Sequence, residues 1–74
     1  MYVKLKYTLK DKTELFEIKE TRLTKAEFYS EVSFLFDDTV IQITIPGKTI
    51  FLRTSDLYSI EVLGVGATRE SLGG

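Results

Sequence analysis

The chain has 74 residues, 43% hydrophobic and 28% charged, which suits one globular domain and leaves no room for two. It has no Cys and no His, which excludes disulfides, thiolate nucleophiles and ordinary zinc sites. We therefore predict a protein that is not an enzyme and holds no cofactor or metal. No apolar stretch approaches the ~20 residues that span a bilayer, and a Cys-free chain fits a reducing compartment. We predict a cytoplasmic protein without a membrane partner.

The first twenty residues predict a β-hairpin. Apolar and polar residues alternate over 2–10, which is typical of a half-buried strand. A polar turn at 11–12 leads into a second strand over 13–20, whose inner face is expected to carry Phe16 and Ile18.

The next segment predicts a helix. Thr24 is a good N-cap and Glu27 completes a capping box three residues later. Two acidic residues at 37–38 oppose the negative end of a helix, so we expect it to end there. The alternation within 32–36 favours a strand instead, and this alternative stays open. Four phenylalanines are expected in the core: Phe16, Phe28, Phe34 and Phe36.

Three further strands are predicted in the second half, over 39–45, 49–53 and 58–63. Pro46 and Gly47 fit the central positions of a type II turn between the first two of them. Thr54, Ser55 and Asp56 predict a turn or one turn of 3₁₀ helix before the last strand.

The element order is therefore β-β-α-β-β-β, which indicates an α+β domain of two layers with one helix on a mixed sheet. We place this single domain at 1–63 and expect a flexible, glycine-containing tail at 64–74. The same order also fits a small SH3-like barrel in which the helix is an insertion between the second and third strands.

Several short stretches are similar to the ubiquitin-like β-grasp family: Met1 to Leu5, Lys12-Thr13, Ile43 to Lys48, Thr54 to Tyr58, and Leu72-Gly73-Gly74. This resemblance implies a β-grasp fold. It also implies one function, a modifier or sulfur carrier that is activated and conjugated through Gly73 and Gly74. In its general character, the chain resembles small orphan proteins encoded by bacteriophages.

Lysines alternate along the first strand and offer a second candidate function. Lys4, Lys6 and Lys10 share a predicted face with Tyr2, and such a face can follow a phosphate backbone while an aromatic ring stacks on a base. The formal net charge is −1, so the alternative, a solvated sheet face, is favoured over a nucleic-acid partner.

Aromatic residues favour a third function, binding to another protein. Phe51 and Tyr58 are expected to point away from the core, and exposed aromatic side chains often mark protein interfaces. We predict a non-catalytic protein-binding module that uses Tyr2, Phe51 and Tyr58, and most concretely a regulator or inhibitor of a host protein. Pairing of two copies through a sheet face or an edge is a further prediction.

Overall fold

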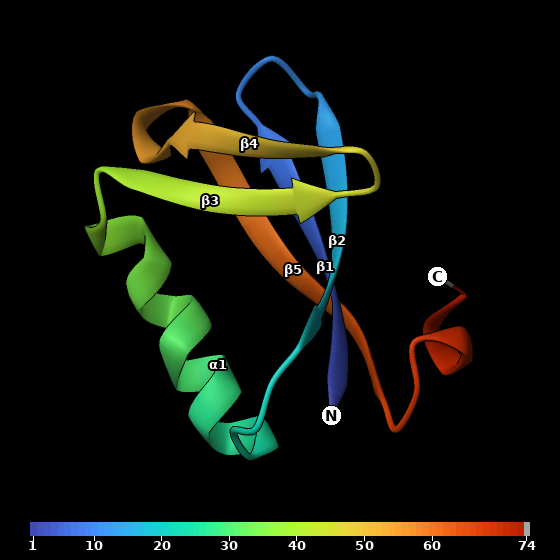
Figure 1. The fold of residues 1–74 in the computed structure, drawn as a ribbon. Coiled ribbons are helices and arrows are strands. Elements are labelled where there is room, and N and C mark those ends of the chain that lie inside the picture. Colours follow the sequence, from blue (N-terminus) through green and yellow to red (C-terminus); the bar gives the residue numbers. More distant parts are fainter. Residues whose placement is uncertain (74) are drawn as a thin grey trace.

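In the computed structural model, which describes residues 1–73, five strands form two antiparallel sheets and one α-helix lies beside them (Figure 1). The elements follow in the order β1 (Tyr2–Leu9), β2 (Glu14–Glu20), α1 (Lys25–Phe34), β3 (Val40–Ile45), β4 (Lys48–Arg53) and β5 (Leu57–Gly66). Three turns of 3₁₀ helix connect or follow them: η1 (Leu35–Asp37), η2 (Thr54–Asp56) and η3 (Glu70–Leu72). The α+β class and the element order are confirmed.

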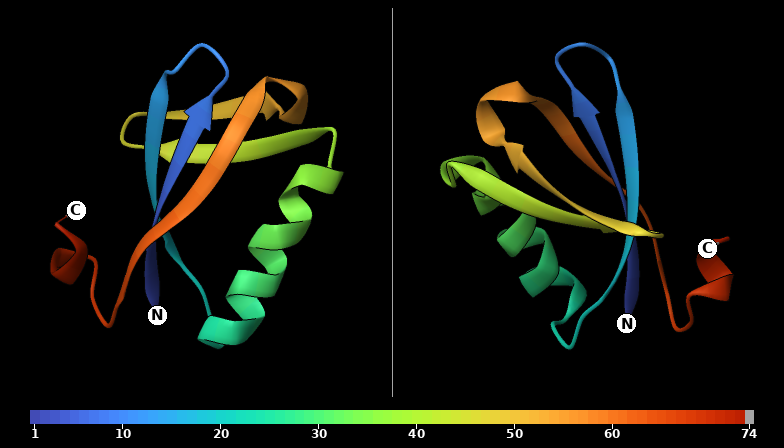
Figure 2. Two further views of the ribbon diagram at one scale, coloured as in Figure 1. Left: turned by 180° about the vertical axis from the view of Figure 1, so that it is seen from behind. Right: turned by 45° about the horizontal axis from the view of Figure 1, so that its top comes forward.

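The strands do not form the expected mixed sheet. β1 lies between β2 and β5 and pairs antiparallel with both, while β3 and β4 form a separate antiparallel hairpin. This hairpin lies across the three-stranded sheet, and α1 lies at one side of both sheets (Figures 1 and 2). The mixed sheet was therefore a wrong prediction, because the pairing of β1 with β5 is antiparallel.

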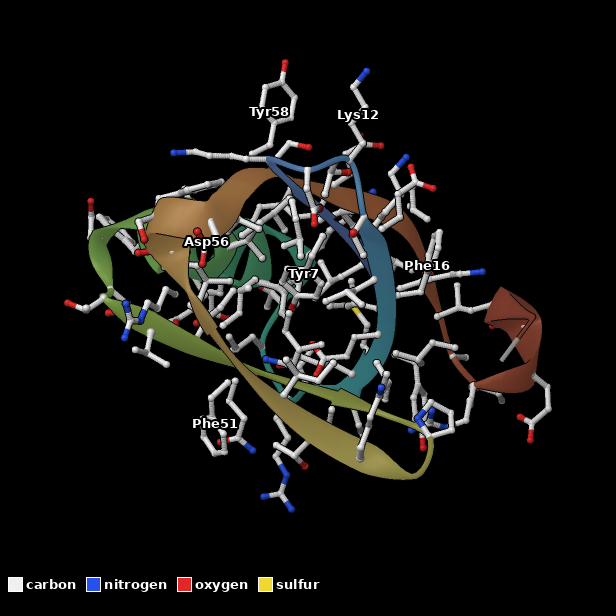
Figure 3. All side chains as sticks on the ribbon, turned by 90° about the horizontal axis from the view of Figure 1, so that it is seen from above. Tyr7, Lys12, Phe16, Phe51, Asp56 and Tyr58 are labelled. Atoms are coloured by element: carbon white, nitrogen blue, oxygen red, sulfur yellow. The ribbon has the colours of Figure 1, made fainter. Side chains whose placement is uncertain are left out.

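The core lies between the two sheets and α1. Every second residue of β1 points into it, as the alternation predicts, and Tyr7 reaches its centre (Figure 3). The buried apolar residues are Val3, Leu5, Tyr7, Phe28, Ile41, Ile43, Leu52 and Leu57.

The first hairpin has its expected position but the opposite inner face on β2. Its register places Leu15 opposite Tyr7 and Glu17 opposite Leu5. Leu15 and Glu17 of β2 therefore lie on the same face of the sheet as the buried residues of β1. Phe16 points outward and is 44% exposed. The prediction that Phe16 and Ile18 lie inside is wrong, because a buried Glu17 takes the place that an apolar residue was expected to fill.

Helix α1 begins as its capping box predicts. The Thr24 hydroxyl accepts a hydrogen bond from the Glu27 amide at 3.2 Å, and a Glu27 carboxylate oxygen accepts one from the Thr24 amide at 3.0 Å. Helical structure continues through η1 to Asp37, so the strand alternative for 32–36 is wrong. Phe28 is buried, but Phe34 is 62% exposed and Phe36 is also exposed, which corrects their predicted core positions.

The last strand is longer than predicted. β5 reaches Gly66, which pairs with Tyr2, so the predicted boundary at residue 63 falls inside a strand. Two shifts in its register with β1, near Leu63 and Tyr58, leave both side chains exposed while Leu57 stays buried. Such irregularities bend and twist a strand.

Beyond β5, the chain folds back so that η3 contacts β1 and β5, on the side of the molecule away from α1 (Figure 2). A Cβ atom on Gly66 would overlap the Ser71 hydroxyl, and one on Gly64 would lie 3.1 Å from the Leu72 side chain. Gly64 and Gly66 are therefore places where the residues of η3 approach the sheet closely.

Candidate functional site

The three aromatic residues predicted to bind a partner do not form one surface. Phe51 and Tyr58 are 71% and 73% exposed, but they point to opposite sides of the molecule (Figure 3). Tyr2 is half-buried, and its hydroxyl donates a hydrogen bond to a Glu20 carboxylate oxygen at 3.2 Å. The Arg69 guanidinium lies 5.7 Å from the centre of the Tyr2 ring. Tyr2 therefore contacts residues 67–73, which we call the C-terminal segment.

Phe51 lies in the middle of a face that the β3–β4 register defines. Residues directly opposite each other share a face, and Phe51 is opposite Gln42. We call this the hairpin face, and its six exposed residues are Val40, Gln42, Thr44, Thr49, Phe51 and Arg53. It carries one aromatic ring, one guanidinium and no carboxylate. Aromatic and Arg side chains are enriched at protein interfaces.

A buried carboxylate holds the hairpin against the three-stranded sheet. Glu17 is 3% exposed. One of its oxygens accepts a hydrogen bond from the Tyr7 hydroxyl at 2.7 Å, and the other accepts one from the Thr44 amide at 2.6 Å. Lys19 lies 3.9 Å from the first oxygen. Burial, and then the hydrogen bond to Glu17, raise the pKa of Tyr7 far above its ordinary value.

The lysines of β1 do not form a continuous row of free cations. Lys6 lies between two carboxylates, 3.1 Å from Glu14 and 3.7 Å from Glu61. The hydrogen bond and charge of Glu14, followed by the charge of Glu61, raise the pKa of Lys6. Lys4 lies 5.9 Å from the centre of the Phe16 ring, and Lys10 lies beyond the end of the strand. The geometry therefore gives the nucleic-acid alternative no support.

A groove of about 390 Å³ that the sequence did not suggest lies on the outer side of β2. Its lining includes Phe16, Ile45, Lys4 and Arg69, from both sheets and the C-terminal segment. Phe16, which the alternation in β2 predicts to be buried, instead lines this groove from the outward side of the strand.

The Gly73-Gly74 pair lies at the limit of the described chain. Gly73 follows η3 with a φ of 72°, and its amide donates to the Glu70 carbonyl at 3.0 Å. Gly74 lies outside the described residues, so the conjugation hypothesis is tested for neither residue.

The described residues offer neither a metal site nor a membrane-spanning helix. Within residues 1–73, no group of three or more acidic side chains is placed to hold a metal ion. The helices of the same residues include none with the length and apolar character needed to cross a membrane.

Comparisons with protein-family models, with curated proteins and with solved structures found no match. The candidate site is thus defined by the geometry of this chain.

Sequence reasoning found Phe51 but missed the rest of the hairpin face. The signal was present, because Val40, Gln42 and Thr44 alternate with buried or half-buried isoleucines in β3. What the sequence could not indicate was the role of Glu17, since its partner Thr44 is 27 residues away.

Proposed function

We propose that this protein is a small, non-catalytic protein-binding module that contacts its partner through the hairpin face. By covering a surface of that partner it would act as a regulator or inhibitor. The observation that carries this proposal is the exposure of Phe51, at 71%, opposite Gln42 and between Thr49 and Arg53 on a face without carboxylates. Burying one such ring in a complex contributes about 1.5–3 kcal/mol.

We also propose that the two sheets form a small SH3-like barrel, with α1 inserted between β2 and β3. Two observations support this arrangement over a β-grasp: the antiparallel pairing of β1 with β5, and the separate β3–β4 hairpin lying across the larger sheet (Figure 1). In such a barrel the outer face of β3 and β4 is free of the helix, which keeps the hairpin face open.

The binding proposal is tested by affinity capture with three forms of the protein as bait: wild type, Phe51→Ala and Tyr58→Ala. Tyr58 is a matched control, because it is as exposed as Phe51 and lies on the opposite side (Figure 3). We expect a stoichiometric protein partner that wild type and Tyr58→Ala retain and Phe51→Ala loses. A partner that all three baits retain equally would overturn the hairpin face as the binding surface.

A further inference from the structure

The β4 strand has an open edge. Within the described residues, β4 pairs with β3 alone. The Thr54 amide donates to the Thr39 carbonyl at 3.0 Å. Thr39 and Thr54 are therefore a hydrogen-bonded pair at the end of the β3–β4 ladder. Because such pairs alternate along an antiparallel ladder, the amides and carbonyls of Thr49, Phe51 and Arg53 point away from β3. The same alternation is seen directly on β3, where the Thr44 amide points away from β4 and reaches Glu17.

Both sides of this edge offer contacts for a further strand. On the outer side lies the hairpin face with Phe51. On the inner side lies a hollow of about 380 Å³, whose lining includes Leu9, Leu52 and Asp56. Successive side chains of a strand point to opposite faces. In an added strand, one side chain would therefore lie beside Phe51, and the side chains before and after it would lie over the leucines of the hollow.

The charges of β4 select the kind of strand that fits. Lys48 and Arg53 lie at its two ends, both are exposed, and neither has an ion pair within the described residues. The strand between them has no carboxylate. A second copy pairing through β4 would therefore add two more cations to the same edge. A segment with an acidic residue at each end is complementary to both.

We propose that the β4 edge binds an extended, acid-flanked segment of a partner protein as an additional antiparallel strand. This rests on the proposed function, because it uses the same hairpin, and it specifies the partner's chemistry. In the antiparallel arrangement, the first, third and fifth residues of the segment exchange hydrogen bonds with Arg53, Phe51 and Thr49. Its first residue faces Arg53 and its sixth faces Lys48.

The probe is a fluorescent peptide, Glu-Val-Tyr-Ile-Thr-Glu, measured by anisotropy against the full chain. Thr49→Pro removes an outward amide without removing a bond to β3, and such a proline is tolerated on an edge strand. We expect it to weaken binding about tenfold or more. Peptide N-methylated at its Tyr should weaken binding similarly, which keeps the test sound if the proline variant does not fold. Tyr58→Ala, at an equally exposed aromatic residue on the opposite side of the molecule (Figure 3), is the matched control and should bind as wild type does.

Charge reversal gives an independent readout. The double variant Lys48→Glu with Arg53→Glu should lose binding to this peptide and gain binding to Lys-Val-Tyr-Ile-Thr-Lys. Equal binding of a scrambled peptide, or sedimentation showing that two copies pair at this edge instead, would overturn the inference. If the Phe51→Ala bait loses its partner while Thr49→Pro keeps it, strand addition is wrong and the proposed function stands. If the Phe51→Ala and Thr49→Pro baits both keep their partner, both proposals are wrong.

Discussion

Tyr7 brings a hydroxyl group into the centre of an apolar core, where only a hydrogen-bond acceptor can make its burial tolerable. Its partner is the Glu17 carboxylate, 2.7 Å away. A charged acceptor next to a phenol favours the protonated form of the phenol, and so does burial. Both effects raise the pKa of Tyr7.

The raised pKa of Tyr7 predicts that the free energy of unfolding falls as pH rises above about 10, the ordinary pKa of tyrosine. Below that pH, Tyr7 is protonated in both states and its contribution is fully present. Above it, the unfolded chain releases the proton that the native chain keeps, so stability falls by up to about 1.4 kcal/mol per pH unit.

Urea unfolding at about pH 8, 10 and 11 measures this loss. Tyr7→Phe should show a smaller slope, and the raised pKa values of Tyr2 and Lys6 leave a residual slope of the same sign. Equal slopes for wild type and Tyr7→Phe would contradict the assignment.

Local sequence is sufficient to predict where α1 begins, but it is not sufficient to predict how the C-terminal segment packs. The start of α1 follows from Thr24 and Glu27, because both partners of the capping box lie within one helical turn. The packing of η3 on the sheet depends on glycines in β5, and glycine by itself is equally typical of a loop. The sequence therefore predicted the helix, but it did not indicate that β5 extends to Gly66 or that the turn η3 follows it.

Gly66→Ala tests the packing of η3. The new Cβ would meet the Ser71 hydroxyl, which would then have to turn away from its acceptor, the Thr68 carbonyl. We therefore expect η3 to pack less firmly on β5. Hydrogen exchange should accelerate at the amides of Leu72 and Gly73, which donate to Arg69 and Glu70. Gly64→Ala is the matched control, because its Cβ would meet the movable end of Leu72 at 3.1 Å and should have a smaller effect. Unchanged exchange in Gly66→Ala would refute this packing.

At the scale of the whole molecule, Glu17 is the polar link between the two sheets. It belongs to β2, and it accepts hydrogen bonds from β1 on one side and β3 on the other. A carboxylate in this position is favourable only while both donors are present, because an unpaired buried polar group costs about 1–3 kcal/mol.

Glu17→Ala is therefore expected to lower the free energy of unfolding by about 2–5 kcal/mol, since it leaves the Tyr7 hydroxyl and the Thr44 amide without their acceptor. Glu17→Gln should cost less, because its amide oxygen still accepts one of the two bonds. Glu31→Ala, at an exposed helix position, is the control and should change stability by less than about 0.5 kcal/mol. Chemical denaturation of the three variants measures these differences, and similar values for Glu17→Ala and Glu31→Ala would refute the link.

Alternation, capping residues and turn residues were sufficient to predict the α+β class, the element order and the exposure of Phe51. These features depend on residues a few positions apart, so a single sequence contains both partners of each contact. Which face of β2 lies inside, how the hairpin crosses the larger sheet, and that Phe51 and Tyr58 point to opposite sides were decided only by the assembled fold. The reason is that each of these depends on partners far apart in the chain, as the bonds from Tyr7 and Thr44 to Glu17 show.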